Sequence, residues 1–144
     1  MRRGRSWIVG IFGVILLISG VSIYSWYGVD DTPPPRIEIT PAFHDFGVVP
    51  YRAVEKNFTV KNGGGSLLRI TGLSTSCGCT MAAVENRELL PGEETRLHVT
   101  FDPNLMSEPV VGEIYRVVYV TTNDPSRPEA EIEIRATVKE RNER

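Results

Sequence analysis

The chain has 144 residues with 18 acidic and 16 basic side chains, a length that leaves room for one ordinary domain and excludes a multidomain enzyme. Three arginines lie before Val29 and no acid does, so the rest carries 13 basic against 18 acidic side chains, a formal charge of −5. That balance argues against a nucleic-acid surface, which would be basic. The two cysteines are one residue apart, which excludes a long-range disulfide framework, so hydrophobic packing is expected to hold the domain.

The N-terminal segment predicts one transmembrane helix. Residues 7–27 form 21 positions without a charge, enough to cross a hydrocarbon core of about 30 Å as a helix. Aromatic residues occupy both ends of the segment, where amphipathic rings prefer the membrane interface. The segment is therefore expected to contact membrane lipid. The arginines of residues 1–6 form a basic head that is expected to stay in the cytoplasm.

A cleaved signal peptide is the alternative interpretation of this segment. The apolar run is long and lacks a convincing cleavage site of small residues before its aromatic end, which favours an uncleaved anchor. Because basic loops stay cytoplasmic, the chain is expected to be a single-pass membrane protein with its C-terminal domain periplasmic or extracellular.

Residues 28–36 are predicted to form a proline-rich linker. The stretch DDTPPPR contains three consecutive prolines, which lack N–H donors and favour an extended polyproline conformation. The linker is expected to hold the following domain, residues 37–139, away from the lipid. A charged tail, residues 140–144, ends the chain.

Three segments alternate between apolar and polar residues: Val54–Lys61, Thr95–Phe101 and Glu131–Lys139. This alternation predicts strands of an antiparallel sheet with one face on a core. The predicted core-facing residues are Val54, Phe58, Val60, Leu97, Val99, Phe101, Ile132, Ile134, Ala136 and Val138, with Lys56 at the wet start of its strand.

Ile114–Val120 is apolar in both parities, which predicts a central strand covered on both sides. Weaker strand candidates are Ile37–Ile39, Leu67–Leu73 and Thr80–Val84, and glycine, proline and Asx turns separate the runs. About seven short strands at this spacing predict an all-β sandwich of two antiparallel sheets, preceded by the transmembrane helix.

Several motifs in the predicted sandwich resemble one bacterial family. They are Asp45, Phe46 and Gly47 after Pro41; Asn62; Ser76, Cys77, Gly78, Cys79 and Thr80; Pro91 and Gly92; and Asn123, Asp124 and Pro125. In order and spacing, Pro41 to Val138 is similar to the family called domain of unknown function 1573. The resemblance implies an immunoglobulin-like fold akin to ASH and major-sperm-protein modules, and a location in the cell envelope. It implies no activity, and a fold alone gives none. The glycine run 63–65 departs from the family's usual turn.

The Cys77–Gly78–Cys79 segment is the strongest candidate in the sequence for a chemically active site. The two thiols are expected to form a short-loop disulfide or to be buried in a turn, and a redox-active pair is the alternative. If the segment is extended, Met81 joins the two cysteines on one side and offers three sulfur ligands to a soft ion such as Cu(I). A zinc site is not expected, because one CxC lacks a second ligand pair.

No catalytic residue and no cofactor are predicted. His98 is expected to face outward on a strand, and His44 to lie in a turn-like stretch, so both are interpreted as surface histidines. Asp45, Asp102 and Asp124 adjoin turn residues, which favours turn capping over calcium binding.

These observations predict a non-enzymatic, membrane-anchored interaction or structural module of the cell envelope. Its unidentified protein partner is expected to bind at loops or along an exposed strand edge, and no nucleic acid is expected. The alternative function is an envelope thiol-redox or copper-handling protein that uses Cys77 and Cys79.

Overall fold

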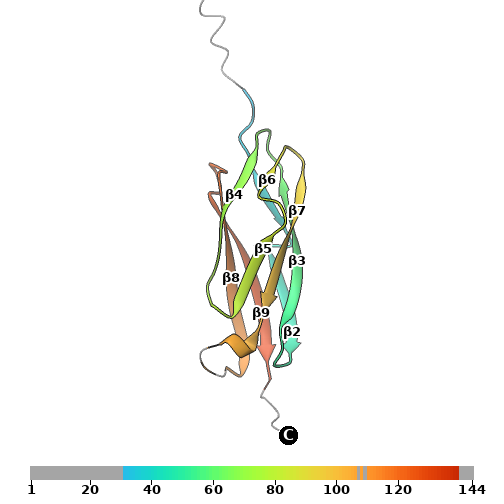
Figure 1. The fold of residues 1–144 in the computed structure, drawn as a ribbon, viewed down its shortest axis with the longest axis vertical. Helices are drawn as coiled ribbons and strands as arrows, with labels where there is room; N and C mark the ends of the chain where they lie inside the picture. The colour runs from blue at the N-terminus through green and yellow to red at the C-terminus, as the bar shows by residue number, and fades with distance from the viewer. Residues whose placement is uncertain (1–30, 107, 109, 140–144) are drawn as a thin grey trace, which may run out of the picture. The chain divides into compact units, whose positions relative to one another are not determined.

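The computed structural model describes residues 31–106, 108 and 110–139. These residues form nine strands and a 3-10 turn, and a compact unit begins at Pro33 (Figure 1). Within the described part of the chain, no helix has the length and apolar character needed to cross a membrane. The predicted basic head, transmembrane helix and charged tail lie outside the described residues.

Two β-sheets form the sandwich, and the first has four antiparallel strands. Its spatial order is β1 (Ile37–Thr40), β3 (Val54–Asn62), β7 (Glu94–Phe101) and β5 (Thr80–Val84). All four strands lie on or beside segments whose residue pattern predicts strands. The 3-10 turn, Pro103–Leu105, follows β7.

The second sheet has five strands. Its spatial order is β2 (Phe43–Val49), β9 (Glu129–Val138), β8 (Gly112–Thr122), β4 (Leu68–Thr75) and β6 (Glu88–Leu89). β2 pairs with β9 in parallel, whereas the other pairs are antiparallel. The chain passes from β1 in the first sheet to β2 in the second through Pro41 and Ala42, and the peptide bond between Thr40 and Pro41 is cis. This split of the first edge strand also raises the strand number above the predicted seven.

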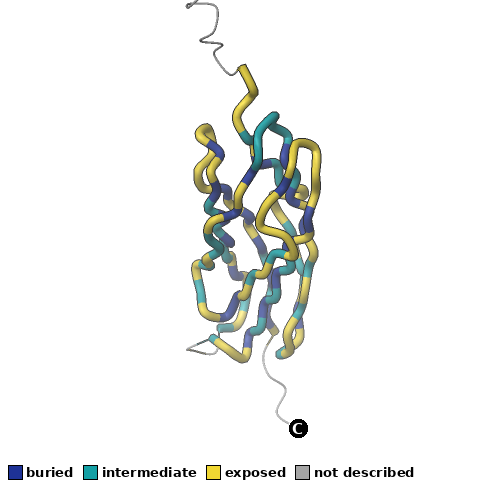
Figure 2. The backbone as a smooth tube through the Cα atoms, turned by 45° about the horizontal axis from the view of Figure 1, so that its top comes forward, coloured by how far each residue is buried: buried dark blue, intermediate teal, exposed yellow. Residues whose placement is uncertain are grey.

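Side chains alternate between core and surface along the strands, as Figure 2 shows by the alternating burial classes. Nearly all predicted core residues of β3, β7 and β9 are buried. The buried ones are Phe58, Val60, Leu97, Val99, Phe101, Ile132, Ile134, Ala136 and Val138. Val54 and Lys56, at the start of β3, are half-buried. The period-2 pattern therefore correctly predicts which residues of these strands build the core.

β8 differs from its prediction. Its inward residues Ile114, Val118 and Val120 are buried, but Tyr115 on the opposite face is 49% exposed, and Val117 and Tyr119 are half-buried. The expectation that both faces are covered is wrong, because the four-stranded sheet covers one face and no described element packs on the other. β8 thus has a neighbouring strand on each side within its sheet, but its outer face is not covered by another layer.

The end of the predicted linker packs on the sandwich. The Gly63 N–H donates to the Arg36 carbonyl (2.8 Å), and the Ser66 hydroxyl donates to the Pro33 carbonyl (2.8 Å). A side chain at Gly64 would overlap the backbone of residues 34–36. The glycine run, which departs from the family's usual turn, thus permits close approach of the proline segment.

Candidate functional site

Motif residues gather at two places in the sandwich. The first, called the linker end, contains Ile37, Asn62 and Asp124; the second, called the cystine end, contains Cys77, Cys79 and Arg116. Ile37 pairs with Asn62 in the β1–β3 register, and its N–H donates to Asp124 Oδ2 (2.9 Å), which brings the three linker-end residues together.

Asn62 is a buried amide at the linker end, with all its hydrogen-bonding groups used. Its Nδ2 donates to the carbonyls of Ser66 (2.8 Å) and Leu89 (2.9 Å). Its Oδ1 accepts from the N–H groups of Gly64 (2.9 Å) and Arg36 (3.4 Å). One side chain thus joins the β3–β4 turn to β6 and to the linker.

Asp124 is a buried carboxylate that binds backbone N–H groups. Besides Ile37, its partners are the N–H groups of Ser126 (2.8 Å) and Arg127 (3.2 Å), which donate to Oδ1. Burial raises the pKa of Asp124, but these three donors outweigh it and hold the pKa below its ordinary value. Oδ1 caps the turn that follows Asp124, as the turn-capping interpretation expects, and Oδ2 binds the distant strand β1.

The neighbouring motif residues also stabilise turns. Asn123 Oδ1 accepts from the Arg69 N–H (2.7 Å), and its Nδ2 donates to the Leu67 carbonyl (3.0 Å). Gly92, which follows Pro91, has a φ of 82° and donates its N–H to the Asn62 carbonyl (2.8 Å). Like Asn62 and Asp124, these residues position backbone.

The Asp45–Phe46–Gly47 motif lies on strand β2. Asp45 Oδ1 accepts from the Gly47 N–H (2.8 Å), and Oδ2 accepts from Nη2 of Arg135 on β9 (2.6 Å). The Arg135 hydrogen bond is the main cause that lowers the pKa of Asp45. The motif thus attaches the parallel edge strand to the sheet.

His44 also lies on β2, so the prediction of a turn-like stretch is wrong. The polar His44 at an inward position and the irregularity after Asp45 interrupt the alternation that would have revealed this strand. The His44 ring contacts those of Phe46 (centroids 4.8 Å apart) and Phe58 (6.3 Å). Burial, then the charge of Lys56, lowers the pKa of His44, and Asp45 opposes them.

His98 is a surface residue, as its strand position predicts. Its Nε2 lies 3.1 Å from Glu85 Oε1 on the outer face of the four-stranded sheet. Among the described side chains, neither histidine is hydrogen-bonded to a serine, threonine or cysteine.

The cystine end contains a disulfide between Cys77 and Cys79, one of the alternatives that the spacing allows. The Thr80 N–H donates to the Cys77 carbonyl (3.0 Å) and closes a turn around the bond. Ser76 exchanges two hydrogen bonds with the backbone of Val117 on β8, both of 2.9 Å. The Asp102 N–H donates to the Cys79 carbonyl (2.9 Å), so both sheets hold this loop.

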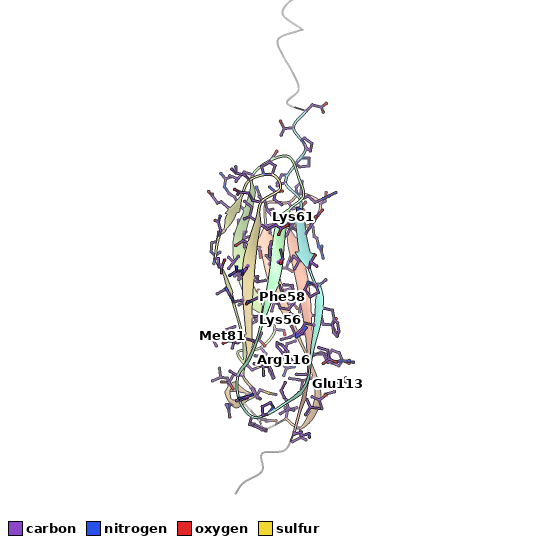
Figure 3. All side chains as sticks on the ribbon, turned by 90° about the vertical axis from the view of Figure 1, so that its right-hand side faces the viewer. Lys56, Phe58, Lys61, Met81, Glu113 and Arg116 are labelled. Atoms are coloured by element: carbon purple, nitrogen blue, oxygen red, sulfur yellow. A yellow bond between two sulfur atoms is a disulfide. The ribbon has the colours of Figure 1, made fainter. Side chains whose placement is uncertain are left out.

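The sulfur atoms of this segment do not share one side. Cys79 is fully buried, Cys77 is partly exposed, and Met81 is 53% exposed on the outer face of the four-stranded sheet (Figure 3). The described residues contain no group of three or more His, Cys, Asp or Glu side chains arranged for a metal ion. The extended conformation in which three sulfurs could be offered to a soft ion is not adopted here, because Cys77 and Cys79 are bonded to each other and the loop turns before β5 begins.

Arg116 is a residue at this end that the sequence interpretation missed. It lies at an inward position of β8, between the buried Ile114 and Val118, and Figure 3 shows it between the outward Met81 and Glu113. Its Nε lies 3.4 Å from Cys79 Sγ, and its Nη1 donates to the Tyr115 carbonyl (2.6 Å). The signal in the sequence that could have revealed it was an arginine at a strand position flanked, two residues away on each side, by the apolar residues Ile114 and Val118.

The fold and its motifs define the class of this protein as an immunoglobulin-like β-sandwich domain. The family model described as "Protein of unknown function (DUF1573)" matches residues 37–138, and the chain belongs to that family. No curated protein matches the chain.

Several solved structures are similar to this chain. A protein of unknown function from Porphyromonas gingivalis W83 has a TM-score of 0.68 and 22% identity, over 76% of this chain and 50% of that one. The secreted serine protease VesC from Vibrio cholerae has a TM-score of 0.50 and 14% identity, over 76% of this chain and 23% of that one. The ASH/PapD-like domain 7 of human CEP192 has a TM-score of 0.46 and 11% identity, over 77% and 89% of the two chains. This chain therefore spans half of the Porphyromonas protein and less than a quarter of VesC.

Proposed function

We propose that this protein is a non-enzymatic binding module, anchored in a membrane by residues 7–27, whose sandwich domain lies outside the cytoplasm and binds a protein partner. The observation that carries the proposal is the uncovered outer face of the five-stranded sheet. β8 has apolar residues on both faces, yet only one face packs against the other sheet.

The outer face combines an apolar row with an acidic row. Tyr115, Val117 and Tyr119 form the apolar row along β8. In the β8–β9 register, Glu133 lies opposite Val117 and Glu131 lies opposite Tyr119, and both glutamates are exposed. Exposed apolar residues rimmed by charge mark protein interaction sites.

This pattern defines the chemistry of the partner. Aromatic side chains provide large contact areas at little cost in conformational entropy, and an adjacent row of carboxylates favours a basic surface. The partner is therefore a protein that offers apolar residues beside lysines or arginines. The anionic row also disfavours nucleic acid, as does the formal charge of the chain beyond its head.

Photo-crosslinking in cells tests the binding face with the full chain. A photo-crosslinking amino acid in place of Val117 is expected to give a discrete adduct with a second protein. The same amino acid in place of Met81, which is exposed on the opposite sheet, is the matched control and is expected to give none. Glu131→Lys together with Glu133→Lys is expected to reduce the adduct. Equal adducts at both positions, or none at Val117, would contradict the proposed face.

A separate experiment tests the location of the domain. The arginines before the apolar run favour a cytoplasmic N-terminus, so an export-dependent phosphatase fused after Arg144 is expected to be active. Activity of only a cytoplasm-dependent reporter at that position would show that the orientation is inverted.

A further inference from the structure

The two residues of the cystine differ in their exposure to solvent. Cys77 is partly exposed, whereas Cys79 is fully buried. Thiol–disulfide exchange begins when a thiolate reaches one sulfur of the bond, and the other sulfur leaves with the electron pair. The geometry therefore makes Cys77 the sulfur that is attacked and Cys79 the sulfur that leaves.

Arg116 lies where the leaving sulfur gains charge. Its Nε is 3.4 Å from Cys79 Sγ, and it forms no ion pair with any carboxylate in the described part of the chain. A guanidinium beside a cysteine stabilises the thiolate, and a better-stabilised leaving thiolate departs faster. The charge of Arg116, which no described carboxylate neutralises, therefore stabilises the reduced form with its Cys79 thiolate more than it stabilises the disulfide.

A second cation occupies an inward position in this half of the sandwich. Lys56 lies on the core parity of β3, two residues from Val54, which shares a register row with Phe101 and Thr80. Lys56 also forms no ion pair among the described residues. The charge of Lys56 acts on His44, so Arg116 is the cation that the structure places beside the cystine.

We propose that Cys77–Cys79 is a redox-active disulfide that oxidises a dithiol, with Arg116 as the positioning residue that stabilises the Cys79 thiolate. The proposal does not rest on the partner-binding face, because neither the cystine in the β4–β5 loop nor the Arg116 side chain belongs to the rows that form it. The loop and Arg116 bind only backbone atoms of Val117 and Tyr115. One molecule of the domain oxidises one dithiol and then needs reoxidation, so it acts as a stoichiometric oxidant.

The exchange proceeds in two steps. A thiolate of the dithiol attacks Cys77 Sγ, a mixed disulfide forms, and the Cys77–Cys79 bond breaks with its electron pair on Cys79 Sγ. The second thiol of the dithiol loses its proton to solvent and attacks the sulfur of the first, which releases Cys77 as a thiolate. The dithiol becomes a disulfide, and the domain gains two electrons; Cys77 takes a proton from water.

Dithiothreitol is the probe for this reaction, applied to the native full chain in detergent. Thiol labelling followed by mass spectrometry measures the reduction rate. Replacement of the guanidinium by a neutral amide, Arg116→Gln, is expected to slow reduction about tenfold and to lower the thiolate absorbance of the reduced protein at neutral pH. Arg116→Lys, which keeps the charge, is expected to restore part of the rate.

Arg69→Gln is the matched control, because Arg69 is an exposed strand arginine paired with Glu88 on β6. It is expected to reduce at the wild-type rate. Thermal melting of the oxidised proteins excludes a loss of fold as the cause of any change. The proposal is overturned if Arg116→Gln reduces as fast as wild type, or if the wild-type cystine resists dithiothreitol until the domain is unfolded.

Discussion

The linker end and the cystine end both place polar groups inside the sandwich, but they satisfy them differently. At the linker end, Asn62 and Asp124 bind backbone groups on every side. At the cystine end, Arg116 has a sulfur and one carbonyl as partners and no carboxylate among the described residues. One end is saturated with hydrogen bonds, and the other contains an unneutralised charge.

This difference separates residues that stabilise the fold from a residue available for function. A buried amide or carboxylate with a full set of backbone partners fixes a loop, and its removal leaves those partners unsatisfied. A cation at an inward position without a counter-ion contributes little to stability, so its location calls for another explanation. Four substitutions test the contrast.

The largest effect is expected for Asn62→Ala. The change leaves the carbonyls of Ser66 and Leu89 and the N–H of Gly64 without a side-chain partner in a buried turn. The free energy of unfolding is expected to fall by about 3 kcal/mol. Asn57→Ala, an exposed position on the same strand, is the control and is expected to change it by less than about 0.5 kcal/mol. Urea denaturation measures both, and equal effects would refute the structural role of Asn62.

Asp124→Asn is expected to lower the free energy of unfolding at neutral pH by about 2 kcal/mol, since an amide cannot accept all three N–H bonds. The pKa of Asp124 is lowered in the folded state, so the ionised carboxylate stabilises the domain above the unfolded pKa. That contribution is lost as the pH falls through the folded pKa. The difference between wild type and variant should therefore shrink below about pH 4.

Chemical denaturation over a series of pH values measures this difference. Glu129→Gln, at an exposed position at the start of β9, is the control, and we expect its effect to stay below about 0.5 kcal/mol. A gap between wild type and Asp124→Asn that is constant down to strongly acidic pH would argue against the assigned role.

Gly92→Ala is expected to cost about 1 kcal/mol, because Gly92 has a φ of 82° and other residues are strained there. A Cβ at this position meets no atom within 4 Å, so the backbone alone causes the effect. Gly78→Ala at the cystine end is the control: its added Cβ is also unobstructed and its φ is not in the left-handed region. Thermal melts should show destabilisation in the first variant alone.

The smallest effect is expected for Arg116→Leu. Leucine suits the apolar parity of β8 and removes an unpaired cation, so the free energy of unfolding should change by less than about 1 kcal/mol in either direction. A loss as large as that of Asn62→Ala in urea denaturation would mean that Arg116 is structural, and the contrast between the two ends would fail.

The sequence determined the sandwich and most of its core because these features depend on local pattern. Alternation with a period of two fixes which side chains of β3, β7 and β9 face inward, whichever strands they pair with. The cysteine spacing likewise indicated a short-loop bond among its alternatives. The predicted membrane segment depends equally on local composition, and it lies outside the described residues.

Tertiary structure alone decided the features that depend on distant segments. The strand-like stretch at Phe43–Val49 became visible through its parallel pairing with β9, about 90 residues away in the chain. The open face of β8 follows from how two sheets stack, which an apolar run does not specify. Arg116 meets Cys79 across 37 residues of sequence, and Ile37 meets Asp124 across 87. Such contacts arise because the folded chain brings those residues together, and no local periodicity encodes which partner a side chain will meet.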